Sequence, residues 1–564
     1  MQQVRILRRA AFLALSLLSA CAASDPSAGG DRSARFIPSG VAGDFLAGRF
    51  ALAEGDPDTA ATDLLRAVAA SPHDQELVLQ AFIACLDAGR PEAVRLARQL
   101  PDSQVAQLVL ANASAKAGNW QDAERRFRTM PRQGLTQLLQ PLLVAWSQQA
   151  EGHTGAALAT LKPLIDSQRF RGIFALHGAM IADLGNRPED AARLYKIAQS
   201  ELPEPSLRLA QILASWQVRS GQRGSVEHTF ATLQAAAPDI SIATRALAAD
   251  AATRPVARPT DGVAEAYFTL AAALRTQDAA DFAMIMIRLA LDMRPDFAAA
   301  RLLAADILQG EHHPDLALRM LAPVQASDVL DGVVRLRRAA LTAQLGRDND
   351  AMQALKRVAK DYPDSPLPDI QLGDLLRAKK RFPEAVTAYN QAIARIPHPE
   401  HADWIVFYDR GIALERDHQW HKAEADFDHA LQLAPDQPFV LNYLGYSWAD
   451  MGRNLDRARS MIQKAAERRP NDGAITDSLG WVMFRQGQVE DAVKTLERAV
   501  ELEPEDATIN GHLGDAYWAA GRKIEAQYQW RRALTLNPAA DDAAKLEAKL
   551  NPAPARSGPV VSDQ

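Results

Sequence analysis

Cysteine is nearly absent from this chain of 564 residues, which carries only Cys21 and Cys85. Cys85 lies in the apolar stretch Phe82-Ile83-Ala84-Cys85-Leu86, a setting that predicts a buried and unreactive thiol. If Cys21 is chemically modified, one thiol remains and an internal disulfide is excluded. The stability of the folded chain must then come from packing and not from cross-links.

Long apolar runs are also scarce. The run from Ala10 to Leu18 is too short to span a bilayer, and it follows a basic start that contains Arg5, Arg8 and Arg9. A basic start and a short apolar run are the proportions of a signal peptide, so residues 1–20 are predicted to be removed. No other stretch resembles a membrane span.

The chain lacks both an excess of basic charge and the common catalytic motifs. Its formal net charge is −6, and loss of the three arginines in residues 1–20 brings it to −9, which argues against a nucleic-acid partner. There is no phosphate-binding glycine loop, no Gly-x-Ser-x-Gly elbow and no His-Glu-x-x-His motif. We therefore predict no enzyme, no catalytic residues, no cofactor and no small-molecule substrate. An enzyme within residues 41–238 is the weakest alternative.

Histidines supply the best metal candidate in the sequence. They are His398, His401, His418, His421 and His429. His418 and His421 are expected near a turn between helices, but no cysteine and no well-placed second pair accompany them. A solvated surface is the favoured interpretation, so no metal site is predicted.

The quartet Leu18-Ser19-Ala20-Cys21 resembles the lipobox of bacterial lipoproteins. That resemblance implies cleavage before Cys21 and lipidation of its thiol. Ala22, where an aspartate would retain a lipoprotein at the inner membrane, implies an outer-membrane location with the body facing the periplasm. Residues 21–40, rich in small and polar residues, are then a flexible tether. The alternative is an ordinary secretory signal cut near Ala20, with Cys21 incidental.

One pattern returns five times between residues 367 and 538. Each copy has a glycine, an alanine twelve or thirteen residues later, a bulky apolar residue four further on, a second alanine three beyond and a proline after five more. The glycines are Gly373, Gly411, Gly445, Gly480 and Gly514, the bulky residues are Tyr389, Phe427, Ile462, Leu496 and Trp530, and the prolines are Pro397, Pro435, Pro470, Pro504 and Pro538.

This pattern is typical of a helical hairpin of about 34 residues and resembles the tetratricopeptide (TPR) repeat. The small glycine lies where another helix approaches too closely for a side chain. Gly452, Gly487 and Gly521 are expected to take the left-handed conformation that ends the first helix. The proline stops the second helix. Because neither helix can bury its apolar stripe alone, the hairpins must stack into an all-α superhelical solenoid.

The same register extends towards the N-terminus with less fidelity, from Gly48 through weaker copies at Ala81, Ala111, Ala145, Ala179 and Ala214. We predict about 14 hairpins in two blocks. The predicted organisation is a degenerate solenoid in 41–238, an irregular linker in 239–261, a second solenoid in 262–538, a capping helix in 539–550 and a disordered tail in 551–564.

In such solenoids the positions three before, one after and four after the glycine tend to face a concave groove. Aromatic and polar residues at these positions predict a partner-binding groove. Its predicted residues are Tyr408, Asn442, Tyr446, Asp477, Trp481, Phe484, Asp515 and Trp518. The alternative is that some of them are core between hairpins, as Trp448 is expected to be. The basic residues of TPR grooves that clamp a terminal carboxylate are missing here.

Three motifs carry a narrower resemblance. They are Leu441-Asn-Tyr-Leu-Gly-Tyr-Ser-Trp-Ala-Asp450, Asp477-Ser-Leu-Gly-Trp-Val-Met-Phe484 and His512-Leu-Gly-Asp-Ala-Tyr-Trp518. With the lipobox they resemble large TPR lipoproteins of bacterial outer membranes. One such group consists of adaptors that present peptidoglycan hydrolases to a carboxyl-terminal processing protease. The resemblance implies a non-enzymatic adaptor with envelope partners. The alternative is a structural subunit of a secretion, pilus or outer-membrane assembly complex.

Overall fold

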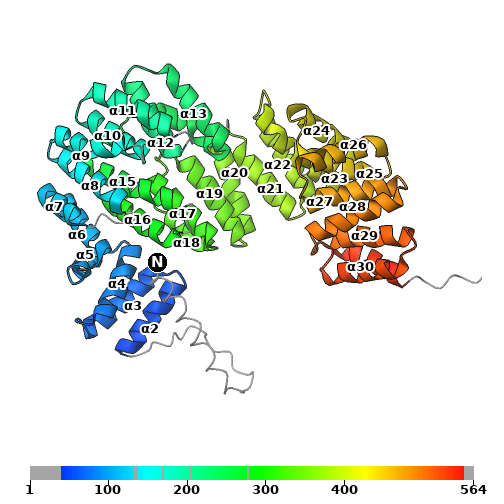
Figure 1. Cartoon of the computed structure of the whole chain (residues 1–564), viewed down its shortest axis with the longest axis horizontal. Coiled ribbons are helices and arrows are strands. Elements are labelled where there is room, and N and C mark those ends of the chain that lie inside the picture. Colours follow the sequence, from blue (N-terminus) through cyan, green and yellow to red (C-terminus); the bar gives the residue numbers. More distant parts are fainter. Residues whose placement is uncertain (1–39, 131–135, 168–169, 203–205, 276–278, 552–564) are drawn as a thin grey trace, which may run out of the picture. The chain divides into compact units, whose positions relative to one another are not determined.

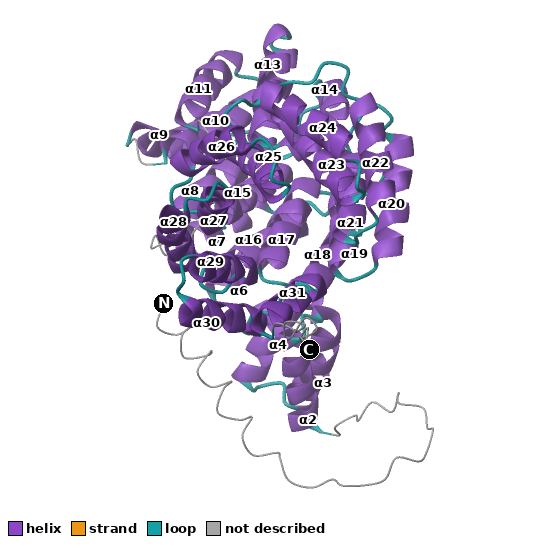
Figure 2. Ribbon diagram, turned by 90° about the vertical axis from the view of Figure 1, so that its right-hand side faces the viewer, coloured by secondary structure: helices purple, strands orange, loops and turns teal. Residues whose placement is uncertain are grey.

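The computed structural model describes residues 40–130, 136–167, 170–202, 206–275 and 279–551. The predicted signal peptide 1–20, Cys21, the tether up to residue 39 and the tail from residue 552 lie outside these ranges. Every regular element in the described ranges is an α-helix or a 3-10 helix, and Figure 2 shows only helices joined by loops. The predicted all-α fold is therefore confirmed. None of these helices is long and apolar enough to cross a membrane.

The chain divides into two compact units, residues 1–101 and 102–564. The first unit contains two hairpins, formed by α2 (Val41–Ala53) with α3 (Pro57–Ala70) and by α4 (Gln75–Asp87) with α5 (Glu92–Ala97). Together with the twelve hairpins of the second unit, the described residues contain 14 hairpins, in agreement with the predicted number of about 14.

In the second unit the first helices of successive hairpins alternate with the second helices. The first helices are α6 (Gln104–Lys116), α8 (Thr136–Ala150), α10 (Arg171–Leu184), α12 (Leu207–Arg219), α15 (Pro259–Leu274), α17 (Ala298–Gly310), α19 (Asp331–Gln344), α21 (Leu367–Ala378), α23 (Trp404–Arg416), α25 (Pro438–Asp450), α27 (Gly473–Arg485) and α29 (Ala507–Ala519). The second helices are α7 (Trp120–Thr129), α9 (Thr154–Asp166), α11 (Pro188–Glu201), α13 (Gly224–Ala236), α16 (Ala280–Met293), α18 (Pro314–Leu321), α20 (Asp348–Asp361), α22 (Phe382–Ala394), α24 (Trp420–Leu433), α26 (Leu455–Arg468), α28 (Val489–Leu502) and α30 (Lys523–Thr535). The short 3-10 helix η2 (His401–Asp403) precedes α23.

The glycine of each hairpin packs directly under the bulky residue of the second helix. A Cβ atom added to Gly480 would lie 2.6 Å from Cγ of Leu496, and one added to Gly514 would lie 2.4 Å from Cδ1 of Trp530. The other three C-terminal copies and Gly48 show the same approach. Since Cβ contacts this short do not occur in folded proteins, the predicted role of these glycines is confirmed.

Each turn between paired helices places one residue in the left-handed region, apart from the turn between α15 and α16, part of which lies outside the described ranges. Gly452, Gly487 and Gly521 have φ angles of 67°, 81° and 80°, as predicted. Lys380 and His418 stand at the equivalent positions of the two preceding hairpins and have φ angles of 58° and 59°. The turn is therefore retained without glycine, at a conformational cost for each of these side chains.

The predicted linker 239–261 contains the 3-10 helix η1 (Pro238–Ala243) and the short helix α14 (Thr244–Asp250). Helix α15 begins at Pro259, which suits the first helical position because its missing N–H needs no partner there. The carboxylate of Asp261 accepts hydrogen bonds from the N–H groups of Ala257 (3.2 Å) and Arg258 (2.9 Å). The division of the chain at this segment stays a prediction.

Helix α31 (Ala540–Leu550) occupies the stretch where a capping helix is predicted. Its Leu546 packs in an apolar cluster with Leu513, Tyr517 and Trp530 of the last hairpin. The opposite side of α31 carries charged residues, such as Asp541 and Lys545, so that the last apolar surface is covered by a polar one.

We expect Gly480→Ala to lower the thermal midpoint, because the new methyl group has to displace Leu496 and overpacking costs roughly 1–3 kcal/mol. Gly511→Ala is the matched control, since its Cβ would meet only Leu546 at 3.7 Å and alanine favours the helix. Thermal unfolding followed by circular dichroism measures both. Equal midpoints for the two variants would contradict this packing.

Candidate protein-interaction faces

The first helices of the second block present the residues predicted to form a partner-binding groove. We call the positions three before, one after and four after the glycine, on helices α21, α23, α25, α27 and α29, the second-block face. Four predicted residues gather on this face around His512, which was not predicted as a site residue. They are Tyr446, Asp477, Trp481 and Phe484.

His512 organises this part of the face through stacking and charge. Its ring lies parallel to that of Trp481 at 4.0 Å, and Nδ1 lies 2.9 Å from a carboxylate oxygen of Asp477. Burial alone would lower the pKa of His512, but the charge and hydrogen bond of Asp477 raise it overall. Trp481 and Asp477 are only 8% and 4% exposed, so they support the face from within, and Tyr446 and Phe484 are the more accessible members.

Three of the four remaining predicted residues, all but Asn442, lie in two further groups. In the last hairpin, Asp515 accepts hydrogen bonds from Trp530 (3.0 Å) and from Nζ of Lys549 (2.7 Å), and Trp518 contacts the ring of Trp530 at 5.3 Å. Trp518 is 40% exposed. Lys549 belongs to α31, which was predicted only as a cap, so its contact with Asp515 was missed.

Tyr408 lies among Trp404, Phe427 and Tyr443, with ring distances between 5.8 and 6.0 Å. Burial raises the pKa of Tyr408 above its ordinary value, so the phenol stays neutral. The predicted aromatic strip is thus divided into three groups on neighbouring hairpins. A role in partner binding for its residues stays a prediction.

Two polar atoms of this face are buried without a hydrogen-bond partner among the described residues. They are the side-chain oxygen of Asn442 and the indole nitrogen of Trp481. One is an acceptor and the other a donor, and leaving either unpaired costs free energy. A ligand with the complementary donor and acceptor would satisfy both atoms, provided that the side chains covering them move aside.

At one end of the face, Asp374 and the neighbouring Asp409, which stands two residues before Gly411, share one guanidinium group. Arg377 lies 3.1 Å from Asp409 and 3.8 Å from Asp374, and Asp374 also accepts a hydrogen bond from Tyr389 at 2.7 Å. Burial, with the charge of Asp374, raises the pKa of Asp409 to about 6, while Arg377 opposes that rise. Two negative charges thus face a single positive charge on this part of the surface.

The first block presents an equivalent face on α6, α8, α10 and α12, and there a segment of the same chain occupies it. Tyr267 of α15 donates a hydrogen bond to Asn112 at 2.8 Å. The backbone of Gly262 lies so close to the ring of Trp146 that an added Cβ would be 2.2 Å away. Figure 1 shows α15 beside α8, against which it packs. The segment therefore fills the place that a partner would take.

Residues just before α15 also contact this face. Arg254 pairs with Asp183 at 3.3 Å, and the carbonyl of Thr253 accepts a hydrogen bond from Ser215 at 2.8 Å. Asn112, Trp146, Asp183 and Ser215 stand one or four residues after the repeat origins at Ala111, Ala145, Ala179 and Ala214. These are positions of the kind predicted to face a partner.

Buried polar contacts fix α15 in this place. Trp146 donates its indole N–H to Nδ1 of His177 at 3.0 Å, and Nε2 lies 3.2 Å from the hydroxyl of Thr269. Burial lowers the pKa of His177 to about 3, so the ring is neutral and its remaining proton points to Thr269. Arg208 of α12 pairs with Glu265 of α15, with Nε 2.7 Å from the carboxylate and both side chains less than a tenth exposed.

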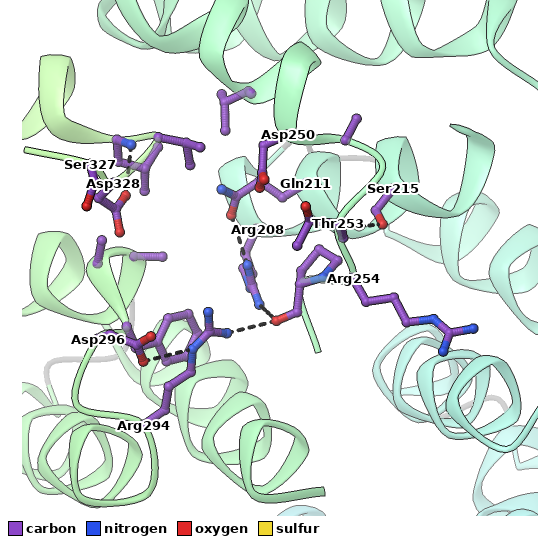
Figure 3. Close-up of a pocket in the computed structure, with 18 residues that line it drawn as sticks. Arg208, Gln211, Ser215, Asp250, Thr253, Arg254, Arg294, Asp296, Ser327 and Asp328 are labelled. Atoms are coloured by element: carbon purple, nitrogen blue, oxygen red, sulfur yellow. Dashed lines mark hydrogen bonds and ion pairs between the residues drawn. The ribbon is translucent and has the colours of Figure 1, made fainter. Parts of the chain in front are cut away.

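A cavity of about 250 Å³ lies beside this segment, between α12, the end of α14 and the loops after α16 and α18. Arg208 and Arg294 both donate hydrogen bonds to the carbonyl of Pro255, at 2.9 and 2.8 Å (Figure 3). Arg254 points away from the cavity in the same view. The two arginines thus hold the backbone of the segment at Pro255.

The predicted histidine group does not assemble into a site. No group of three metal-ligating side chains occurs within the described ranges. Nδ1 of His401 lies 2.8 Å from the carbonyl oxygen of Leu433, and His429 packs against Phe407 at 4.3 Å. His418 is the left-handed turn residue of its hairpin.

We expect Glu265→Ala to destabilise the second unit strongly, by roughly 3–5 kcal/mol, because it leaves the buried charge of Arg208 uncompensated. Asp364→Ala is the matched control, since it removes the ion pair with Arg245, whose two side chains are 91% and 82% exposed. Urea unfolding compares them. A similar small effect for both variants would contradict a fixed α15.

We expect Asp409→Asn to be more stable than the parent protein above pH 6. The pKa of Asp409 is raised, so the folded state holds its proton more tightly than the unfolded state, and the stability that this proton supplies is lost as pH rises from about 4 to about 6. Asparagine stays neutral throughout. Denaturation at pH 3.5, 5 and 7.5 should show no difference at the lowest pH and a growing one above it. A stability difference between variant and parent that stays constant with pH would show that Asp409 is not desolvated. The control is Asp491→Asn, on the exposed side of α28.

Comparisons with known proteins agree with the repeat pattern. Residues 217–406 match the family model "Tetratricopeptide repeat-like domain", and residues 480–521 match the model "TPR repeat". A TPR repeat-containing protein of Pseudomonas aeruginosa is 30% identical over 166 residues, which are 29% of this chain and 27% of that protein. The chain thus matches only about a quarter of that relative.

Two solved structures resemble the chain over different lengths. A tetratricopeptide repeat protein of Parabacteroides merdae is 15% identical and has a TM-score of 0.37, with 45% of this chain and 98% of that chain covered. A chain of the APC/C hetero-tetramer Cut9–Hcn1 is 14% identical and has a TM-score of 0.37, with 91% of this chain and 97% of that chain covered. The helical hairpins and the two family matches together show that the chain is an all-α solenoid of tetratricopeptide repeats. This is a fold of protein–protein interaction scaffolds.

Proposed function

We propose that this chain is a non-enzymatic adaptor of the bacterial envelope. Lipid on Cys21 holds it in the outer membrane with the body in the periplasm. Its partners are envelope proteins, namely client proteins and a periplasmic protease of the carboxyl-terminal processing class or cell-wall machinery such as peptidoglycan hydrolases. The mechanism is co-localisation, because two proteins held on one scaffold meet at a high effective concentration.

The observation that carries this proposal is the difference between the two faces. On the first block, α15 packs against α8 and α10 and takes the place of a partner. On the second block, α31 covers part of the last hairpin, where Lys549 pairs with Asp515 and Leu546 lies against Gly511, whereas α23, α25 and α27 pack chiefly against their own second helices and neighbouring hairpins. Partly exposed aromatic residues, above all Trp518, remain there for a partner.

We expect the double variant Phe484→Ala/Trp518→Ala to lose its envelope partners. The tagged, lipidated protein would be recovered from mildly cross-linked envelopes and its companions identified by mass spectrometry. A periplasmic serine protease together with cell-wall hydrolases should be enriched by the parent protein and reduced at least fivefold by the variant. Ile524→Ala/Tyr528→Ala is the control, since both residues are exposed on the outer helix α30.

The outcomes of this experiment separate the alternatives. Equal recovery by the parent and the face variant would contradict partner binding at the second-block face. Stoichiometric recovery of secretion, pilus or outer-membrane assembly proteins through detergent purification would favour the structural subunit. A Cys21→Ser variant that stays with the outer membrane would contradict the lipid anchor and leave the scaffold untouched.

A further inference from the structure

The first block shows which kind of segment such a face binds. Residues 251–258, Ala-Ala-Thr-Arg-Pro-Val-Ala-Arg, contain no α-helix and run between α14 and α15. A cationic side chain of this segment, Arg254, pairs with the carboxylate of Asp183, which is 9% exposed and also binds Arg219. The main chain at Thr253 accepts a hydrogen bond from the first-helix side chain of Ser215. The segment is thus a basic, non-helical ligand that is covalently attached to the face that it covers.

The second-block face repeats this chemistry. Glu415 stands four residues after Gly411, as Asp183 stands four after Ala179. Its side chain is 31% exposed, pairs with the exposed Arg416 at 3.2 Å and accepts a hydrogen bond from Tyr443 at 3.2 Å. Asp374 on the preceding hairpin and Asp409 on the same helix as Glu415 share one cation, Arg377, whereas Asp183 in the first block is compensated by two guanidinium groups. The second-block face therefore lacks one cation that the first-block face has.

The unpaired polar atoms point to the same kind of ligand. Trp481 is 8% exposed and its indole N–H has no acceptor within the described ranges, while the side-chain oxygen of Asn442 has no donor. An extended peptide offers a carbonyl and an N–H at every residue, which are the two groups missing here. Rings of Tyr446 and Phe484 beside them suit the aliphatic part of a long cationic side chain.

We propose that the second-block face binds an extended segment of a partner protein that carries arginine or lysine among small residues and proline. This inference rests on the proposed function and specifies the chemistry of the partner. The cationic side chain compensates the carboxylates of Glu415, Asp374 and Asp409. The main chain of the segment pairs with Trp481 and Asn442.

The chain's own segment supplies the probe. A fluorescein-labelled peptide with the sequence of residues 250–259 is added to the full-length protein, and binding is followed by fluorescence anisotropy. Because the attached copy holds the first-block face at high effective concentration, the free peptide can compete only for the second-block face. We expect saturable binding to the parent protein.

Two matched comparisons test the charge. A peptide with Arg254→Gln and Arg258→Gln should bind at least tenfold more weakly. The protein variant Glu415→Gln/Asp409→Asn should bind the original peptide at least fivefold more weakly, whereas Glu490→Gln, on the exposed side of α28, should leave binding unchanged.

Several results would overturn the proposal. Absence of binding, equal binding of the glutamine peptide, or equal binding by the Glu415→Gln/Asp409→Asn variant would each remove the basic segment as ligand. Binding that appears only after residues 552–564 are deleted would assign the face to the chain's own C-terminus. The two proposals can also fail separately. If Phe484→Ala/Trp518→Ala loses its envelope partners but the parent protein binds no peptide, the adaptor function is retained and only this ligand class is rejected.

Discussion

The structure depends on one close approach, in which a bulky side chain of each second helix packs directly on a glycine of the first helix. At Gly480 and Gly514 there is no room for even a methyl group beside Leu496 and Trp530. This contact sets the distance between the paired helices, and the stacking of equal hairpins then aligns the first helices in a row. Residues one and four positions after each glycine consequently recur on one face. The interaction faces of the chain are a product of this internal packing.

A solenoid built in this way repeats the same face on successive hairpins. The first-block face and the second-block face nevertheless differ in what covers them. In the first block, Tyr267, Gly262 and Arg254 of one continuous segment meet successive first helices, and the buried pair of Arg208 with Glu265 holds that segment in place. Breaking such a pair is costly, so the arrangement is permanent on the scale of a binding event. We propose that partner binding is thereby directed to the second block, where Asp374 and Asp409 share one arginine and Trp518 remains partly exposed.

The periodic part of the molecule was predictable because the contacts that define each repeat join residues close together in the sequence. Gly480 and the Leu496 side chain that packs on it lie within one hairpin, and each turn glycine also lies within its hairpin. The spacing of these residues is therefore visible in the sequence. Contacts between hairpins were not predictable in the same way. His512 joins Asp477 and Trp481 across two hairpins, Lys549 reaches Asp515 from the capping helix, and α15 crosses back onto α8 after an irregular segment. None of these pairs has a fixed spacing. Lys380 and His418 keep the left-handed turn although neither residue type predicts it.

Amide hydrogen exchange on the full-length protein tests most directly whether the first-block face is permanently filled and the second-block face is free. The account predicts that the amides of α15 exchange only with global unfolding of the second unit, and that addition of a bound partner slows exchange in α23–α29 but not in α6–α12. Rapid exchange of α15 in the free protein, or protection of α6–α12 by the partner, would show that the chain's own segment leaves its place and would contradict the account.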